Sequence, residues 1–449
     1  MSNEEYAGYL GSTLQWLQNN QLEVWDEIEV VKSGSKIKGV ILPRNELASP
    51  GYVTLKLATG YNIGISTRGI QTVKKTGRRK GEYRVPRADV TTKTDLPFIP
   101  ILGCGGTIAS RLDYETGGTI PALSPEELLS SFPEIANLAR IKTRLIFELF
   151  SENIGFEHYT KILEEIEKLI KQKKAQGVVL THGTDTMAFT AAAISFAITN
   201  SPIPIVITGS QRSSDRPSSD SFFNLYNSVM YVSSPEAKKE VVVIMHETSS
   251  DTACSIHQAT RVRKMHSSRR DTFQTIGAAP LGRIEAGKIM YNQEDTPFLQ
   301  EEAPETRKFQ IKKKFEPMVA MFQHYPGVQP GNLEYFLENG YKGIVLVGTG
   351  LGHISSKLIP LVQAATTELE MVVVMATQAL HGFTGMSVYE TGRRLIKAGV
   401  VPVGNMLPET AYIKLSYLLA NYSVNRVKEL MPKNLKGEIL SLERYNAFP

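Results

Sequence analysis

Residues 177–198 read GVVLTHGTDTMAFTAAAISFAI, and this stretch decides the fold. Its first four residues form a short apolar run that predicts a buried strand, and 187–198 is an apolar run long enough for a helix. The polar segment between them predicts a loop at the carboxyl end of the strand. A buried strand that leads into a helix is the repeating unit of a parallel, doubly wound sheet.

The same alternation recurs on both sides of this unit. We expect further strands in FIPILGCGG (98–106) and at 145–150, 203–208 and 241–245, and an amphipathic helix at 157–174. A second series of apolar runs begins at Val319 and continues at 344–347 and 371–375. The sequence therefore predicts an α/β protein, with a larger domain at 97–280, a polar linker at 281–314 and a smaller C-terminal α/β domain at 315–449.

The front of the chain has a different pattern. A short helix is predicted in the first twenty residues, and short alternating runs at 27–31, 37–42, 52–57 and 61–65 are separated by Gly, Ser, Asn and Pro. Four or five such strands predict a small β-barrel, so 1–72 is expected to be a helix and barrel unit. A basic linker at 73–96 follows; between Lys74 and Arg87 it carries seven basic residues against the single acid Glu82. We favour a solvated connector; the alternative is a contact with the RNA phosphate backbone.

Composition excludes several classes of protein. The 449 residues carry 50 Lys+Arg and 45 Asp+Glu, a net charge of +5, which is too balanced for a protein that binds nucleic acid over its whole surface. Two cysteines cannot build a disulfide framework, and the eight histidines show no metal-binding spacing. There is no apolar run of transmembrane length, and the N-terminal MSNEEY does not resemble a secretory signal. We expect a cytoplasmic protein with no membrane contact and no metal.

Three segments at or after predicted strand ends could carry chemistry: 103–107 (GCGGT), 181–186 (THGTDT) and 261–264 (RVRK). A threonine is a poor nucleophile until a base removes its proton, and a lysine held beside an aspartate can act as that base. Each segment also has a structural interpretation. Thr107 could cap a helix, Asp185 could sit at a helix start, and His182 is more often a hydrogen-bonded core residue than a base. Lys264 alone would ordinarily be an exposed surface residue.

A further glycine cluster, GTGLG at 348–352, is similar to a dinucleotide-binding fingerprint. Its third glycine comes one residue too early, and no acidic residue follows the next strand at the expected distance. We therefore do not favour a nucleotide cofactor.

The motifs in combination resemble the bacterial-type L-asparaginase family. GGTIAS (105–110), THGTDTM (181–187), TGSQR (208–212) and the Lys264 segment occur in that order, and GTGLGH, TQALHG and YETGR follow in the C-terminal part. The front of the chain is more specific. GVILPRNELASPGYVTLKLATGYNIGIS (39–66), the basic linker and LPFIPIL (96–102) are similar to the GatD family of archaeal glutamyl-tRNA(Gln) amidotransferases.

This resemblance implies an asparaginase-like core behind a small barrel, and an amide-hydrolysing subunit that uses a threonine nucleophile with a Thr-Asp-Lys relay. Glutamine or asparagine would be the amide donor. The released ammonia would convert Glu-tRNA(Gln) to Gln-tRNA(Gln) in a complex with a GatE-like partner, which would hold the ATP and magnesium. The resemblance implies no cofactor in this chain, and a homodimer within a heterotetramer.

Site residues follow from the matching motifs. The resemblance assigns catalytic roles to Thr107, Thr184, Asp185 and Lys264, and substrate binding to Ser151, Glu152 and the backbone near Gly183. Thr107 is our first choice as nucleophile and Thr184 is the alternative. Tyr114 is the candidate for a tyrosine on a mobile flap, and Cys104 stands where the family usually has Thr or Ser.

Two other functions remain open. A stand-alone asparaginase needs neither the barrel nor the basic linker. A catalytically silent RNA-binding adaptor does not need the intact threonine, aspartate and lysine set.

Overall fold

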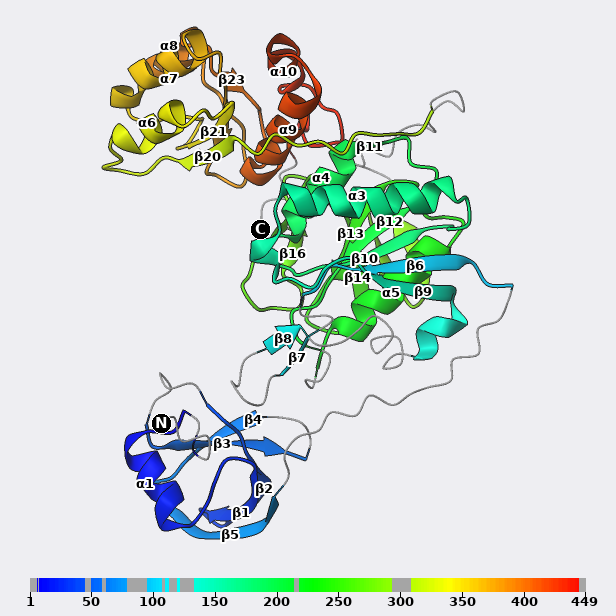
Figure 1. The fold of residues 1–449 in the computed structure, drawn as a ribbon, viewed down its shortest axis with the longest axis vertical. Coiled ribbons are helices and arrows are strands. Elements are labelled where there is room, and N and C mark those ends of the chain that lie inside the picture. Colours follow the sequence, from blue (N-terminus) through cyan, green and yellow to red (C-terminus); the bar gives the residue numbers. More distant parts are fainter. Residues whose placement is uncertain are drawn as a thin grey trace.

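A computed structural model describes residues 6, 8–44, 50–58, 62–78, 95–106, 110–112, 119–121, 133–213, 218–292 and 308–443. Figure 1 shows three units in chain order: an N-terminal sheet, a large sheet flanked by helices, and a smaller C-terminal α/β unit. Two residues predicted for the site, Thr107 and Tyr114, lie outside the described residues.

The N-terminal unit is a five-stranded antiparallel sheet in the order β4-β3-β2-β1-β5. Its elements are α1 (Gly11–Asn19), β1 (Asp26–Lys32), β2 (Ser35–Ile41), β3 (Tyr52–Leu57), β4 (Asn62–Ser66) and β5 (Ile70–Arg78). Side chains from α1 and the strands share one apolar core, as Leu17, Ile28 and Leu55 do. The described strand pairs give an open order rather than a closed barrel. Strand β5 runs past the predicted boundary at residue 72, so the linker begins later than expected.

The central unit contains an eight-stranded sheet in the order β18-β17-β14-β13-β12-β10-β6-β9. Its strands are β6 (Phe98–Gly103), β9 (Arg140–Leu145), β10 (Val178–Thr181), β12 (Ile205–Thr208), β13 (Val241–His246), β14 (Ala253–Gln258), β17 (Gly282–Glu285) and β18 (Lys288–Tyr291). The five strands from β9 to β13 are parallel, and β14, β17 and β18 continue the sheet antiparallel. The predicted doubly wound sheet is therefore confirmed, with an antiparallel extension at one side.

Helices cover both faces of this sheet (Figure 1). They are α3 (Phe156–Lys171), α4 (Met187–Ala197) and α5 (Ser221–Ser233). Alternate residues of each strand face opposite sides: Leu180 joins the core shared with α3 and α4, whereas Val179 joins the core shared with α5. Burial on both faces explains why these strands are continuous apolar runs rather than alternating ones.

Shorter elements complete the central unit. They are β7 (Ser110–Leu112), β8 (Thr119–Pro121), η3 (Pro133–Asn137), η4 (Ser151–Asn153), β11 (Ile198–Thr199), β15 (Val262–Lys264), β16 (Phe273–Thr275) and β19 (Gln310–Ile311).

Two predicted segments differ from the structure. The apolar run at 145–150 is not a strand; β9 ends at Leu145, and Phe147 packs edge-on against His158 at the start of α3. The run is apolar because several of its side chains pack against the main core from a loop. The predicted linker at 281–314 contains β17 and β18, which pair with β14 and with each other. These strands are polar and half-exposed, so the sequence shows no apolar run that would predict them.

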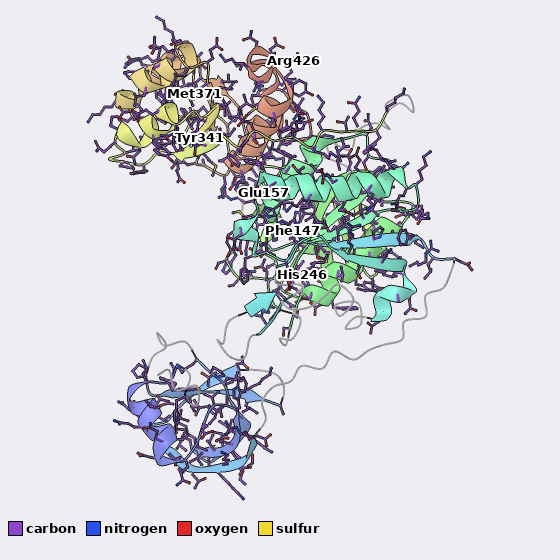
Figure 2. All side chains as sticks on the ribbon, viewed as in Figure 1. Phe147, Glu157, His246, Tyr341, Met371 and Arg426 are labelled. Carbon is purple, nitrogen blue, oxygen red and sulfur yellow. The ribbon has the colours of Figure 1, made fainter. Side chains whose placement is uncertain are left out.

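The C-terminal unit is a parallel four-stranded sheet in the order β20-β21-β22-β23. Its elements are β20 (Val319–Gln323), α6 (Gly331–Glu338), β21 (Gly343–Gly348), η5 (Ser356–Leu358), α7 (Ile359–Thr367), β22 (Val372–Thr377), α8 (Glu390–Lys397), β23 (Val401–Pro402), α9 (Pro408–Asn421) and α10 (Val424–Leu430). The predicted second α/β series is confirmed. Side chains fill the interiors of the units (Figure 2), and α9 packs on α4 to join the C-terminal unit to the central one. Among the described residues, no helix is both long and apolar enough to span a membrane.

Candidate active site

The carboxyl ends of the parallel strands bring three loops together. The amide of Cys104, just after β6, donates to the carbonyl of Thr181 at 2.9 Å, and the amide of His182, just after β10, donates to the carbonyl of Thr208 at 2.9 Å. The loops after β6, β10 and β12 therefore leave the sheet side by side. This edge is where open α/β sheets bind ligands.

Glycines let these loops approach more closely than any side chain would allow. A Cβ on Gly106, which has a φ of +88°, would lie 2.4 Å from the amide nitrogen of Gly183. A Cβ on Gly183 would lie 2.7 Å from the Cβ of Ser151. The loop that leads into Thr107, the loop that carries Thr184 and the η4 turn that begins at Ser151 are therefore in direct contact.

Lys264, the last residue of β15, reaches this edge from another part of the chain. Its Nζ lies 2.9 Å from Oγ1 of Thr184 and 2.8 Å from Oδ1 of Asp185. The Lys264 side chain is 14% exposed and that of Asp185 is 68% exposed, so the ammonium is largely enclosed while its carboxylate partner faces solvent. The structure thus joins three residues that the sequence placed in two separate segments.

This arrangement has a definite chemical capacity. Thr184 is buried, and its hydroxyl is directly in contact with an amine that can exchange a proton with it. Asp185 fixes the position of that amine through an ion pair. A hydroxyl, an amine and an orienting carboxylate are the components of an activated nucleophile or a proton relay.

The residues predicted to bind substrate lie next to this group. Ser151 is buried and Glu152 is exposed, both in the η4 turn. The hydroxyl of Thr186 donates to the carbonyl of Ser151 at 2.7 Å, so the loop after β10 holds the turn in place. Ser151 therefore lies against the loop that carries Gly183 and Thr184, and Glu152 follows it in the same turn.

His182 has a structural role. Its ring is fully buried, with Nδ1 2.7 Å from the carbonyl oxygen of Gly183 and Nε2 2.9 Å from Oγ1 of Thr190. Burial lowers its pKa to about 4. Cys104 is also fully buried, and burial raises the pKa of its thiol well above the usual value. Because both side chains are fully buried, neither one is accessible to a substrate bound at the ends of the strands.

The sequence prediction missed a carboxylate that organises the TGSQR loop. Asp220, directly before α5, is buried and accepts hydrogen bonds from the backbone amides of Gln211 and Arg212 and from the hydroxyl of Ser210. Asn224, one helical turn later, donates to Asp220 and to the carbonyl of Gly209. The available signal was an Asp at a helix start followed by Asn at i+4, which is also the pattern of an ordinary helix N-terminus.

Part of the basic linker is paired within the N-terminal sheet. Lys75 lies 2.7 Å from the buried carboxylate of Asp26, and Arg78 lies 2.6 Å from Glu23. These two residues are therefore engaged within the N-terminal unit, whereas the part of the basic run from residue 79 to 87 lies outside the described residues. No cluster of three or more His, Cys, Asp or Glu side chains that could hold a metal ion is present in the part of the chain that the structure describes.

Comparison with known protein families divides the chain in the same way as the structure does. Residues 22–75 match the GatD N-terminal domain, 99–297 match the asparaginase N-terminal domain, and 318–431 match the glutaminase/asparaginase C-terminal domain. The second match ends beyond β18, in agreement with the longer central unit. The predicted asparaginase-like pair of α/β domains is confirmed.

Curated relatives match over nearly the whole length. The D subunit of the glutamyl-tRNA(Gln) amidotransferase of Pyrococcus furiosus is 42% identical over 97% of this chain and 99% of its own length. The protein of the same name from Sulfolobus acidocaldarius is 42% identical over 98% of this chain and 97% of its own.

Solved asparaginase structures match a shorter part of the chain. The thermostable L-asparaginase of Thermococcus kodakarensis has a TM-score of 0.67 and 30% identity, and the match covers 77% of this chain and 99% of that one. The probable cytoplasmic L-asparaginase of Campylobacter jejuni has a TM-score of 0.64 and 27% identity, and the match covers 75% of this chain and 100% of that one.

Proposed function

The chain belongs to the GatD family of glutamyl-tRNA(Gln) amidotransferases, and we propose that it hydrolyses the side-chain amide of glutamine or asparagine to supply ammonia for the conversion of Glu-tRNA(Gln) to Gln-tRNA(Gln). The observation that carries the chemistry is the contact of Lys264 with both Thr184 and Asp185. The GatD relatives cover nearly the whole chain, whereas the solved asparaginases leave about a quarter of it unmatched. This difference favours the amidotransferase subunit over a stand-alone asparaginase.

The residues around Thr184 suit an α-amino acid. The α-ammonium group of the donor needs anions, which Asp185 and Glu152 would supply. Its α-carboxylate needs hydrogen-bond donors, which the Ser151 hydroxyl and the backbone amides near Gly183 would supply. With both ends of the amino acid held in this way, its side-chain amide would point to the threonines.

The reaction would proceed through a covalent ester. One threonine hydroxyl attacks the amide carbon, with Thr107 as our first choice and Thr184 as the alternative. With Thr184 as the nucleophile, Lys264 would act as the base that accepts its hydroxyl proton and returns a proton to the departing nitrogen; with Thr107 as the nucleophile, the hydroxyl proton of Thr107 would go to the departing nitrogen. Backbone amides of the glycine-rich loops stabilise the tetrahedral oxyanion, each contributing on the order of 3 kcal/mol. The C–N bond breaks, ammonia leaves, and water then hydrolyses the ester to release glutamate or aspartate.

The family assignment implies a partner. We propose a GatE-like partner that holds the ATP, the magnesium and the mischarged tRNA, and a homodimer of this chain within a heterotetramer. This chain itself would need no cofactor, since threonine chemistry uses only protein groups. Ammonia would pass to the partner without release to bulk water, because protonation would remove its nucleophilicity. Because the proposed substrate is a charged tRNA, we expect the reaction to take place in the cytoplasm.

The test measures ammonia release and Gln-tRNA formation by this chain alone and with its partner. We expect glutamine-dependent Gln-tRNA formation by the complex, and Thr107→Ala or Thr184→Ala to abolish it while ammonium-dependent formation persists. Thr367→Ala, which removes an exposed hydroxyl on α7, is the matched control and retains both activities. Rapid asparagine turnover by the chain alone, unaffected by partner and tRNA, would favour the stand-alone asparaginase.

A further inference from the structure

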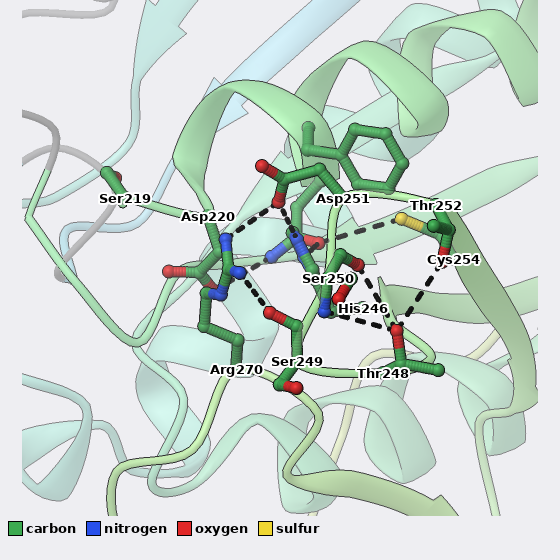
Figure 3. Close-up of polar contacts among 12 residues, drawn as sticks. Ser219, Asp220, His246, Thr248, Ser249, Ser250, Asp251, Thr252, Cys254 and Arg270 are labelled. Carbon is green, nitrogen blue, oxygen red and sulfur yellow. Dashed lines mark hydrogen bonds and ion pairs between the residues drawn. The ribbon is translucent and has the colours of Figure 1, made fainter. Parts of the chain in front are cut away.

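A chain of polar side chains connects two loops of the active site, and His246 is at its centre (Figure 3). His246 is the last residue of β13 and is fully buried. Its Nδ1 lies 2.6 Å from Oδ1 of Asn224, and its Nε2 lies 2.9 Å from Oδ1 of Asp251. Both ring nitrogens therefore face oxygen atoms. None of the groups assigned to amide hydrolysis above includes this histidine.

The orientation of the Asn224 amide is fixed by its other contacts. Its Nδ2 donates to the carbonyl oxygen of Gly209 at 2.9 Å and to Oδ2 of Asp220 at 3.1 Å. Because two acceptors hold the amide nitrogen, the amide oxygen must face His246. That oxygen can only accept, so Nδ1 of His246 carries a proton.

The other ring nitrogen faces a carboxylate. Oδ1 of Asp251, in the turn between β13 and β14, lies 2.9 Å from Nε2 of His246 and 2.7 Å from Nη1 of Arg270. Arg270 also donates to the backbone carbonyl of Ser249. Asp251 thus links His246 to the loop between β15 and β16. A protonated Nε2 makes this contact a hydrogen bond, whereas a lone pair there would face the anion and repel it.

The two ends of this series of hydrogen-bonded side chains contact different loops of the active site. At one end, Asp220 and Asn224 hold the loop that follows β12. In this loop, a Cβ on Gly209 would lie 3.2 Å from Cγ2 of Thr184, so the loop packs against that side chain. At the other end, Arg270 belongs to the hairpin whose first strand ends at Lys264. The network therefore connects the loop that packs against Thr184 with the hairpin that carries Lys264.

We propose that His246 is a positioning residue for amide hydrolysis, and that in its doubly protonated form it bridges Asn224 and Asp251 and so holds Thr184 and Lys264 in register. This inference rests on the proposed function, because register matters only if these two groups react together. A displacement of about 1 Å at a reacting pair can cost up to about a hundredfold in rate.

The bridge has a defined dependence on pH. The titratable and charged groups around His246 are Asp220 before α5, Asp251 in the β13–β14 turn, the buried thiol of Cys254 on β14, and Arg270 and Asp271 in the β15–β16 loop. Burial lowers the pKa of His246, and the carboxylates oppose that shift. A neutral ring must lose one of its two contacts. Asn224 is pinned by two acceptors and Asp251 is 58% exposed, so the contact to Asp251 opens as pH rises through the pKa of His246.

The first experiment replaces the exposed partner. Asp251→Asn in the full chain with its partner removes the negative charge but keeps the size and one acceptor oxygen. We expect kcat for ammonia release from glutamine to fall about tenfold with KM changed less than about twofold. We also expect the high-pH loss of kcat to move to lower pH. Glu285→Gln, which removes a half-exposed carboxylate paired with Arg283 in the same sheet, is the control and leaves both unchanged.

The second experiment reads the protonation state without activity. Histidine-selective ¹⁵N labelling of the full chain, with the His246 signals assigned through His246→Gln, gives the protonation of each ring nitrogen from pH 5 to 8. We expect both nitrogens to be protonated at the acid end, and deprotonation at lower pH in Asp251→Asn. An active wild type with an identical pH profile in Asp251→Asn, or an Nε2 that carries no proton at pH 5, overturns the inference. A wild type that releases no ammonia under any condition instead contradicts the proposed function, and the labelling still tests the bridge.

Discussion

Lys264 and Thr184 are 80 residues apart in the chain, yet Nζ of the lysine lies 2.9 Å from the hydroxyl oxygen of the threonine. The contact is made between β15, which lies outside the eight-stranded sheet, and the loop at the end of β10. Asp185 holds the amine from its solvent-facing side. The predictions below follow from the way the fold maintains this contact.

Asp185→Asn should impair both binding and turnover. The change keeps the shape of the side chain but removes the charge that orients Lys264 and that would bind the α-ammonium group of the donor. We expect kcat/KM for glutamine to fall at least about a hundredfold, since a charged contact to substrate and the ion pair to the amine are both lost. Steady-state ammonia release measures this. An unchanged KM would show that Asp185 does not bind the donor.

Gly183→Ala should block the loop contact. Its Cβ would lie 2.7 Å from Cβ of Ser151, so either the η4 turn or the loop after β10 must move. We expect a loss of amide hydrolysis with little change in ammonium-dependent Gln-tRNA formation. Gly64→Ala is the control, because a Cβ there meets nothing within 4 Å. Equal activity in the two variants would contradict the close packing of the loops.

The sequence predicted the central strand and helix units because the hydrophobic pattern within each segment is enough to indicate its structure. The strand at 178–181 and the helix at 187–197 are largely buried, so both are mostly apolar, and the length of each run distinguishes the strand from the helix. The polar hairpin of β17 and β18 lies in the segment predicted to be a linker, since half-exposed antiparallel strands carry little apolar signal. Likewise, the run at 145–150 resembles a strand but is a covering loop.

The candidate site was predictable in its residue types and not in its distances. Nothing in local spacing brings Lys264 to Thr184; that expectation came from family resemblance, and the geometry came from the structure. The network of Asp220, Asn224 and His246 was not predicted at all. Its members are distant in sequence, and each one alone has the pattern of a common structural residue. Long-range hydrogen bonding cannot be inferred from such patterns.

His257 should make the protein less stable in acid. Its side chain is fully buried, and burial lowers its pKa to about 3. The unfolded state binds the proton first, so stability is retained above the unfolded pKa near 6.5 and falls as pH drops below it. Between pH 7.5 and pH 5 this residue should cost about 2 kcal/mol.

The measurement compares chemical denaturation of the wild type and His257→Leu at both pH values, followed by circular dichroism. Leucine cannot titrate, so the variant should lose less stability on acidification even if it is less stable at neutral pH. An identical pH dependence in the two proteins would mean that His257 is protonated in the folded state as easily as in the unfolded one.

Arg261 should be a main contributor to the junction between the central and C-terminal units. Its buried guanidinium donates to the carbonyls of Ile276 at 2.7 Å and Glu438 at 2.9 Å. Arg261→Met leaves these carbonyls buried without donors, at a cost of about 3 kcal/mol or more. Thermal unfolding should show a clear fall in Tm. Arg394→Met, at an exposed helical ion pair, is the control and should change Tm by little.

The measurement that tests the central claim most directly compares glutamine-dependent and ammonium-dependent Gln-tRNA formation by the full complex carrying Lys264→Met or Lys264→Arg. Methionine removes the amine, and arginine cannot be deprotonated in a protein. We expect both variants to lose glutamine-dependent formation by at least about a thousandfold while ammonium-dependent formation stays near that of the wild type. Substantial glutamine-dependent activity in Lys264→Arg would contradict a proton-accepting role for Lys264 beside Thr184.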